Sequence, residues 1–195
     1  MSSTHPLPSD TLFIADNLAL DFINTAYGVG DGQQDCLVND EAVVSWLKRA
    51  GQLTDDFAET PPKGLLTLAH ELRNCARAVV TAAIAGAPVD LATVNHVLDA
   101  GQPAKTIERD EQAHAFRIAT RRRNNEPASL LEPIAASLAS LLTSDKFEYV
   151  KQCEAHDCVL LFHDLTKSHR RRWCSMATCG NRMKVAAFRS RKKGD

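Results

Sequence analysis

Two pairs of cysteines near the C-terminus constrain this chain more than any other feature. Cys153 and Cys158 form one C-x4-C pair, in CEAHDC, and Cys174 and Cys179 form the other, in CSMATC. Soft thiolates select Zn²⁺ or an iron centre, and a closed set of four leaves no open position for water. The pattern therefore predicts one structural Zn²⁺, whose binding stabilises a segment too short for a hydrophobic core of its own.

Other fates of these cysteines stay open at the level of sequence. The four thiols could form two disulfides or remain free, and His156, His163 or His169 could replace one cysteine as a ligand. The N-terminus, MSSTHPLPSD, lacks the basic start and apolar stretch of a secretory signal, and no apolar run would span a bilayer. We therefore expect a cytoplasmic protein without membrane contact, in a reducing compartment that favours metal ligands over disulfides.

Charge is distributed unevenly along the chain. Residues 167–195 carry ten Lys/Arg and one acidic residue, while the other 166 residues carry 13 basic and 23 acidic ones, so the net charges are +9 and −10. Such a basic end, next to a metal-bound segment, favours a polyanionic partner. The opposite charges also suggest that the acidic body restrains the basic end until a signal arrives.

The segment after Cys179, GNRMKVAAFRSRKK, predicts a helix from about 180 to 192. We expect Val185 and Phe188 to dock its apolar patch on the cysteine hairpin. The basic side chains can reach phosphates and base edges in the DNA major groove, although phosphate attraction without base reading is the simpler interpretation. The candidate nucleic-acid contacts are Arg170, Arg171, Arg172, Asn181, Arg182, Lys184, Arg189, Arg191, Lys192 and Lys193.

Residues 1–144 predict a mainly helical N-terminal domain with a small β element, and Ser144-Asp145 predicts a linker to the cysteine segment at 145–195. Apolar residues recur at helical spacing after Asp16 or Asn17 and over 41–50, 61–85, 91–100 and 127–143. Residues 105–108 and 115–120 are typical of a hairpin, and a short strand is expected at 12–15. The fold class is therefore α+β.

Four polar residues of this domain are candidates for a ligand pocket. Asp21 and Asn24 interrupt an apolar segment, where a buried hydrogen bond to backbone is the simpler role. His70 and Arg73 lie on the longest predicted helix, where a solvated or salt-bridged position is the simpler role. The sequence shows no Ser/His/Asp arrangement, paired-carboxylate motif or HExxH, so we expect no enzyme.

The segment WCSMATCGNRMKVAAFRSR, at 173–191, resembles the CGNR zinc finger of bacterial proteins, named after the four residues at 179–182. LALDFINT at 18–25, VVSWLKRAG at 43–51 and ELRNCARAVV at 71–80 resemble the ABATE domain that accompanies this finger. The resemblance implies a stress-induced transcription regulator that binds double-stranded DNA through a treble-clef-like C4 finger, a β-hairpin plus a helix. It also implies an N-terminal domain that senses a small-molecule effector, and metal ligands at Cys153, Cys158, Cys174 and Cys179.

A zinc-stabilised protein- or RNA-interaction module is the alternative to a DNA-binding regulator. RNA readers usually offer aromatic side chains on which bases stack. The C-terminal tail contains Trp173 and Phe188, and we expect both in the core. The sequence therefore favours duplex DNA.

Overall fold

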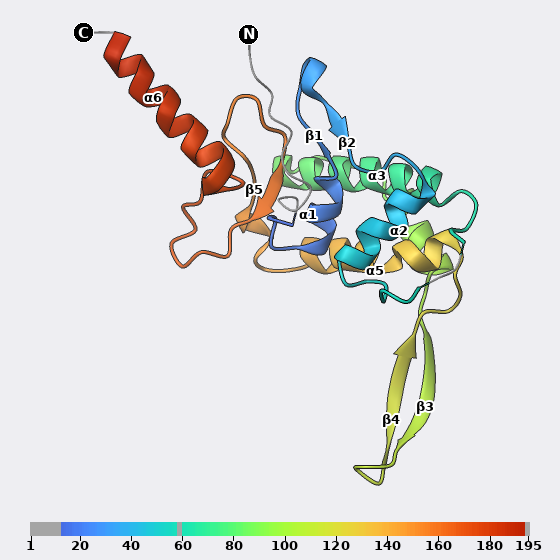
Figure 1. Cartoon of the computed structure of the whole chain (residues 1–195). Coiled ribbons are helices and arrows are strands. Elements are labelled where there is room, and N and C mark those ends of the chain that lie inside the picture. Colours follow the sequence, from blue (N-terminus) through green and yellow to red (C-terminus); the bar gives the residue numbers. More distant parts are fainter. Residues whose placement is uncertain (1–12, 58–59, 194–195) are drawn as a thin grey trace.

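The computed structural model describes residues 13–57 and 60–193, which form a helical body with two projections (Figure 1). The body contains α1 (Leu18–Ile23), α2 (Asp40–Arg49), α3 (Leu65–Ala85), α4 (Ala92–Ala100) and α5 (Pro127–Leu142). The antiparallel hairpin of β3 (Ala104–Asp110) and β4 (Ala115–Arg121) extends from one end, and α6 (Asn181–Lys193) extends from the opposite end. The mainly helical N-terminal part with a small β element is confirmed.

Two smaller hairpins complete the described chain. β1 (Ala26–Tyr27) pairs with β2 (Gln34–Asp35) across the short 3-10 helix Gly30–Gly32. β5 (Val150–Gln152) pairs with β6 (Leu161–His163), after the 3-10 helix Phe147–Tyr149. A π-type turn, Met176–Gly180, leads directly into α6. In the described ranges, no helix has both the length and the apolar character needed to cross a membrane.

Local signals set the helix ends. The side chain of Asn17 accepts a hydrogen bond from the Leu20 amide, and that of Asn39 accepts one from the Ala42 amide, so both cap their helices. α2 ends before Gly51, whose φ of +69° is the left-handed conformation that favours glycine.

The short strand expected at 12–15 is wrong for residues 13–15, which form no strand, and Leu12 lies outside the described residues.

The core of the body forms where α5 packs against α1, α3 and α4. Phe22 of α1 is fully buried, and its ring meets the Trp46 ring edge-on with centroids 5.2 Å apart. In α4, Val94 and Val97 are buried, whereas Leu91, immediately before the helix, is 41% exposed. Apolar residues at helical spacing therefore supply the core face of α4.

The cysteine segment shares this core with the body. Leu161 and Phe162 of β6 are buried in the same hydrophobic cluster as Leu20 and Phe22. The predicted linker at Ser144 is a hydrogen-bonded turn, in which the Ser144 carbonyl accepts from the Phe147 amide. The finger is therefore packed onto the helices, and its orientation depends on them.

Candidate metal centre and basic surface

The four predicted metal ligands converge at the end of the β5–β6 hairpin. The Sγ atoms of Cys153, Cys158, Cys174 and Cys179 all lie within 4.8 Å of one another. The Cys158–Cys174 and Cys174–Cys179 sulfur separations are 3.9 and 3.5 Å. Tetrahedral Zn²⁺ with Zn–S bonds of about 2.3 Å requires sulfurs about 3.8 Å apart. The donor set therefore fits one structural Zn²⁺, as the cysteine spacing predicts.

The surroundings of the sulfurs also suit a metal thiolate centre. Cys153, Cys174 and Cys179 are buried, and Cys158 is half-buried. The Cys174 amide donates to Cys153 Sγ at 3.3 Å, and Arg182 Nη2 donates to Cys179 Sγ at the same distance. These donors stabilise negative charge on sulfur. Burial limits the access of water to the sulfurs, which is typical of a structural metal site.

The four thiols shift one another's pKa values, because they lie within hydrogen-bonding distance of one another. Hydrogen bonds from Cys158 above all, and then from Cys174 and Cys179, hold the pKa of Cys153 far below its usual range. The hydrogen bond to Cys153 is the main cause that raises the pKa of Cys174. Without a cation, four adjacent thiols cannot all become thiolates, because each negative charge disfavours ionisation of the others. Bound Zn²⁺ would supply the positive charge that lets every ligand be a thiolate.

The alternative histidine ligands have other roles or lie apart from the thiols. His163 Nε2 hydrogen-bonds the Lys146 carbonyl oxygen, and its backbone belongs to β6. His169 Nδ1 hydrogen-bonds the Asp164 carbonyl oxygen, and its ring stacks on Tyr149 with centroids 3.7 Å apart. His156 is exposed and does not join the sulfur cluster formed by the described residues.

The arginine run at 170–172 separates into different environments. The Arg171 guanidinium donates to Asp16 and to the Ile14, Trp173 and Cys174 carbonyl oxygens, and lies 4.3 Å from the Phe162 ring centroid. Arg172 pairs with Glu154, with 2.6 Å between Nε and Oε2, while Arg170 is exposed. Arg171 is therefore engaged within the protein, whereas Arg170 and Arg172 point outward and the charge of Arg172 is balanced by Glu154.

Asp164 organises the loop that carries these arginines. Its carboxylate accepts from the Lys151 ammonium, from the amide and hydroxyl of Thr166, and from the Arg171 amide. Although burial raises the pKa of this carboxyl, the hydrogen bonds outweigh burial and hold the pKa well below its usual range. Asp164 was not among the residues singled out from the sequence. The available signal was the Asp-x-Thr pattern at 164–166, which is typical of a side-chain-bonded turn.

α6 begins at the metal centre and then leaves the body (Figure 1). Gly180 is buried where a Cβ would lie 2.6 Å from Met176 Sδ, so glycine allows this close packing. Met183 packs against the core. The expectation that Val185 and Phe188 dock on the finger is wrong, because they are 48% and 56% exposed.

The basic candidates on α6 differ in what they contact. Arg182 Nη2 lies 2.8 Å from Asp157 Oδ1 as well as near Cys179 Sγ, which places this residue beside the metal ligands. Lys192 Nζ lies 5.7 Å from the Phe188 ring centroid. The remaining described candidates on this helix are exposed, namely Asn181, Lys184 and Arg189, whereas the side chains of Arg191 and Lys193 lie outside the described part.

Comparison with protein families places this architecture. A family model described as "ABATE: Putative stress-induced transcription regulator" matches residues 16–145, well over half of the 195-residue chain. The chain belongs to the ABATE family. A second model, described as the CGNR zinc finger, matches residues 149–192 and so includes all four clustered cysteines. A comparison with curated proteins gave no match.

Within the ABATE domain, Asp21 and Asn24 both bind backbone groups near the finger. Asp21 Oδ1 accepts from the Ile14 and Ala15 amides, each at 2.9 Å. Burial raises the pKa of Asp21 to about 6, although these two amides lower it. Asn24 donates to the Leu161 carbonyl oxygen at 2.8 Å and accepts from the Leu161 amide at 2.9 Å. Both side chains thus take the buried hydrogen-bonding role that the sequence made the simpler one.

His70 and Arg73 of the ABATE domain meet at Asp35 instead. Arg73 is 5% exposed and donates to Asp35 and to Thr25 Oγ1, while His70 Nε2 hydrogen-bonds the Leu37 carbonyl oxygen and lies 3.6 Å from Asp35. Although burial raises the pKa of Asp35, the Arg73 hydrogen bond contributes to a net lowering. The four pocket candidates therefore divide into two contact groups, one at the finger and one at β2.

Arg77 of the ABATE domain is a further residue that was not singled out from the sequence as a site residue. Its guanidinium donates to the Val159 carbonyl oxygen at 3.0 Å, and to those of Ile23 and Ala26 at 2.8 and 3.0 Å. It thereby connects α3, the end of α1 and the loop before β6. The signal available was a cation four residues after Arg73, on the same helix face.

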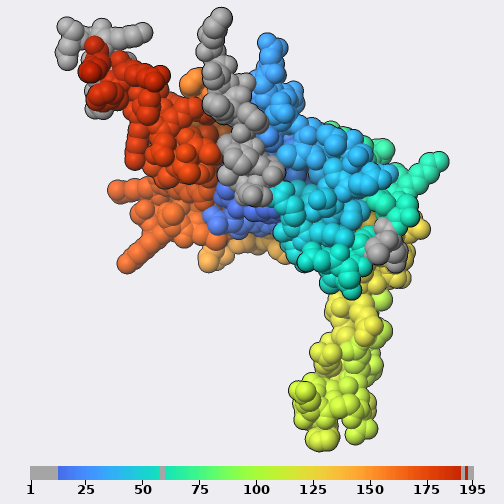
Figure 2. All heavy atoms as spheres, viewed as in Figure 1, coloured from blue at the N-terminus to red at the C-terminus, as the bar shows by residue number. Residues whose placement is uncertain are grey.

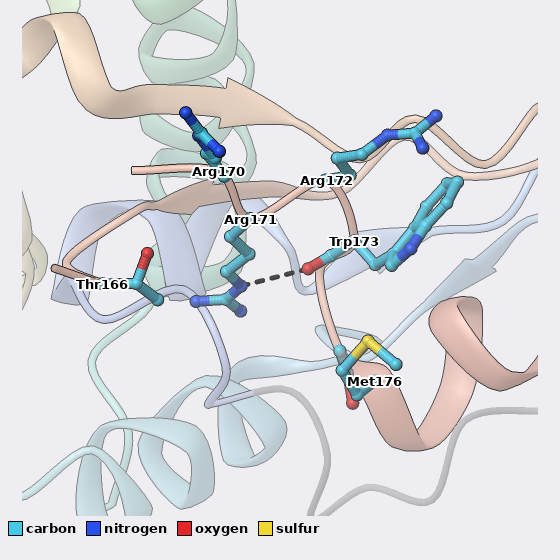
Figure 3. A pocket seen from close by; sticks show the side chains of 7 residues that line it. Thr166, Arg170, Arg171, Arg172, Trp173 and Met176 are labelled. Atoms are coloured by element: carbon cyan, nitrogen blue, oxygen red, sulfur yellow. Dashed lines mark hydrogen bonds between the residues drawn. The ribbon is translucent and has the colours of Figure 1, made fainter. Parts of the chain in front are cut away.

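The CGNR finger bears a surface hollow of about 440 Å³ beside the arginine loop. Figure 3 shows Arg171 within it, its Nε bonded to the Trp173 carbonyl oxygen, whereas Arg170 and Arg172 point in different directions. Thr166, Ser175 and Met176 complete the lining. Because the outward arginines do not converge there, they suit an extended anionic surface better than one small anion.

Proposed function

We propose that this ABATE protein regulates transcription by binding duplex DNA through α6 and the outward arginines of the adjacent loop. The observation that carries the proposal is the composition and position of α6. The helix holds six Lys/Arg and no acidic residue, and it extends away from the body (Figures 1 and 2). Its thirteen residues span about 20 Å, long enough to lie in a major groove.

Duplex DNA fits these features better than RNA. The major groove of DNA admits an α-helix, whereas the major groove of A-form RNA is too deep and narrow for side chains to read. Trp173 is half-buried, and the Arg172 guanidinium lies 4.9 Å from its ring centroid, so this ring is partly covered. Phe188 is exposed, but it lies between basic residues on a regular helix.

Salt-dependent binding of the full zinc-loaded chain to random duplexes tests the proposal. We expect Lys184→Ala with Arg189→Ala to reduce the slope of log affinity against log salt by roughly one for each phosphate that the variant no longer neutralises. Arg109→Ala provides a matched control, because Arg109 is also exposed but lies on the β3–β4 hairpin. Equal slopes for the double variant and the control, or a preference for RNA in competition, would refute the proposal.

The same proposal includes a small-molecule effector, and one cavity offers a place for it. A space of about 300 Å³ lies between Thr81 and Ile84 of α3 and the finger strands, where Val150, Lys151, Gln152 and Leu161 line it. A ligand there would touch the ABATE domain and the strand that leads to Cys153. We expect compounds that raise the melting temperature of the chain to lose this effect in Ile84→Trp, which fills the cavity. Compounds that stabilise both proteins equally would exclude this location.

A further inference from the structure

The exposed apolar pair on α6 is the feature that phosphate binding does not use. Val185 and Phe188 lie three residues apart, which places their side chains about 60° apart around the helix axis. They are 48% and 56% exposed, and α6 contacts the rest of the described chain at its first turns. A helix that only attracted phosphates would gain nothing from a large aromatic side chain in this position.

Basic residues flank this pair on both sides of the helix. Arg189 lies about 40° to one side of Val185, and Lys184 lies about 100° to the other. Lys192 lies one turn beyond Phe188 on the same face, with its Nζ 5.7 Å from the Phe188 ring centroid. Figure 2 shows this end of the molecule standing clear of the body in that view. When such a helix lies in a groove, the flanking cations Arg189 and Lys184 face the two phosphate backbones, and Val185 and Phe188 between them face the groove floor.

The floor of the major groove offers one apolar group, the 5-methyl of thymine. We infer that Val185 and Phe188 contact thymine methyl groups, so that this protein selects A·T pairs through apolar contacts. The inference rests on the proposed binding of duplex DNA. Charge complementarity supports this occupant, because an apolar pair with a cation on either side matches a methyl-bearing floor between two phosphate backbones. Two apolar side chains offer little area for burial in a lipid surface, where binding scales with apolar area.

Uracil substitution isolates the methyl group. A duplex selected by the wild-type, zinc-loaded chain is remade with deoxyuridine in place of thymidine, which removes the methyls but keeps the hydrogen-bonding edges. We expect affinity to fall roughly fourfold for each contacted methyl, the loss that corresponds to one buried CH₂. Phe188→Ala should bind the two duplexes with a ratio closer to one. Phe116→Ala, which alters a 76% exposed phenylalanine on the β3–β4 hairpin, should keep the wild-type ratio.

Each result decides the inference. Equal affinity of the wild-type chain for thymine and uracil duplexes would overturn it while leaving DNA binding in place. A selection that returns no preferred sequence would also overturn it, because the apolar pair would then read no base. Absence of any duplex binding would overturn the proposed function as well. Binding to anionic phospholipid vesicles that is lost in Phe188→Ala, together with indifference to uracil, would assign the pair to a membrane surface.

Discussion

Asn24 makes the sharpest test of how the finger is attached to the helices. Its side chain is fully buried and forms two hydrogen bonds with the backbone of Leu161, one to the carbonyl oxygen and one from the amide. Asn24→Leu keeps a similar side-chain volume but removes both hydrogen-bonding groups, so the Leu161 amide and carbonyl oxygen lose these partners. Each buried backbone group left unpaired costs about 1–3 kcal/mol. We therefore expect the variant to lose about 2–5 kcal/mol of unfolding free energy.

Urea unfolding of the zinc-saturated chain, followed by circular dichroism, measures this loss. The control is Asn74→Ala, since Asn74 is exposed on α3 and should shift the free energy by no more than about 0.5 kcal/mol. Asn24→Asp adds a second check. Its carboxylate would oppose the Leu161 carbonyl oxygen, and protonation at low pH would restore a donor, so stability relative to wild type should recover as pH falls. Equal free energies for Asn24→Leu and the control would refute the reasoning.

Four further predictions concern the metal ligands, Arg182, Asp21 and the β3–β4 hairpin. We expect metal analysis to find one zinc per chain in the wild type and in Cys75→Ala but none in Cys174→Ala, because Cys75 lies outside the cluster. Arg182→Ala should weaken zinc retention against a chelator about 10–100-fold, because it removes the hydrogen bond to a ligand sulfur; retention equal to wild type would contradict this. Burial raises the pKa of Asp21 to about 6 from 3.8, so the folded state binds this proton more tightly than the unfolded state. The stability of wild type relative to Asp21→Asn should therefore fall by about 2–3 kcal/mol between pH 4 and 7 in urea titrations, and a constant difference would reject it. Ile107→Thr should change the unfolding free energy by less than about 1 kcal/mol, since Ile107 is 77% exposed and pairs only across the β3–β4 hairpin.

The contacts between the ABATE domain and the finger give a physical basis for coupling them. Asn24 and Arg77 bind the backbone around β6, and Asp21 holds Ile14 and Ala15. The Ala15 carbonyl oxygen accepts a hydrogen bond from the His163 amide at 2.8 Å. A shift of α1 or α3 would therefore change the setting of the strands that carry the metal ligands. Most of α6 extends away from the acidic part of the chain (Figure 1), and its first turn is held there by the Arg182–Asp157 ion pair.

Local rules account for what could be predicted from the sequence. The four metal ligands could be predicted from residue type and spacing, because each C-x4-C pair is short enough to place two thiolates on the same metal ion. The helices of the body follow from apolar periodicity and from caps such as Asn17 and Asn39. The β3–β4 hairpin follows from alternation across a polar turn. Each of these signals depends on residues a few positions apart.

Only the tertiary structure decided which polar side chains form hydrogen bonds within the protein and which apolar side chains remain exposed. Asn24 bonds a residue 137 positions away, and Arg77 bonds one 82 positions away, so their partners depend on how helices and strands pack. Packing also turned Arg171 inward and left Phe188 exposed. Sequence pattern shows that a residue is charged or apolar. Whether it is buried, paired or exposed is set by neighbours that folding brings from distant parts of the chain.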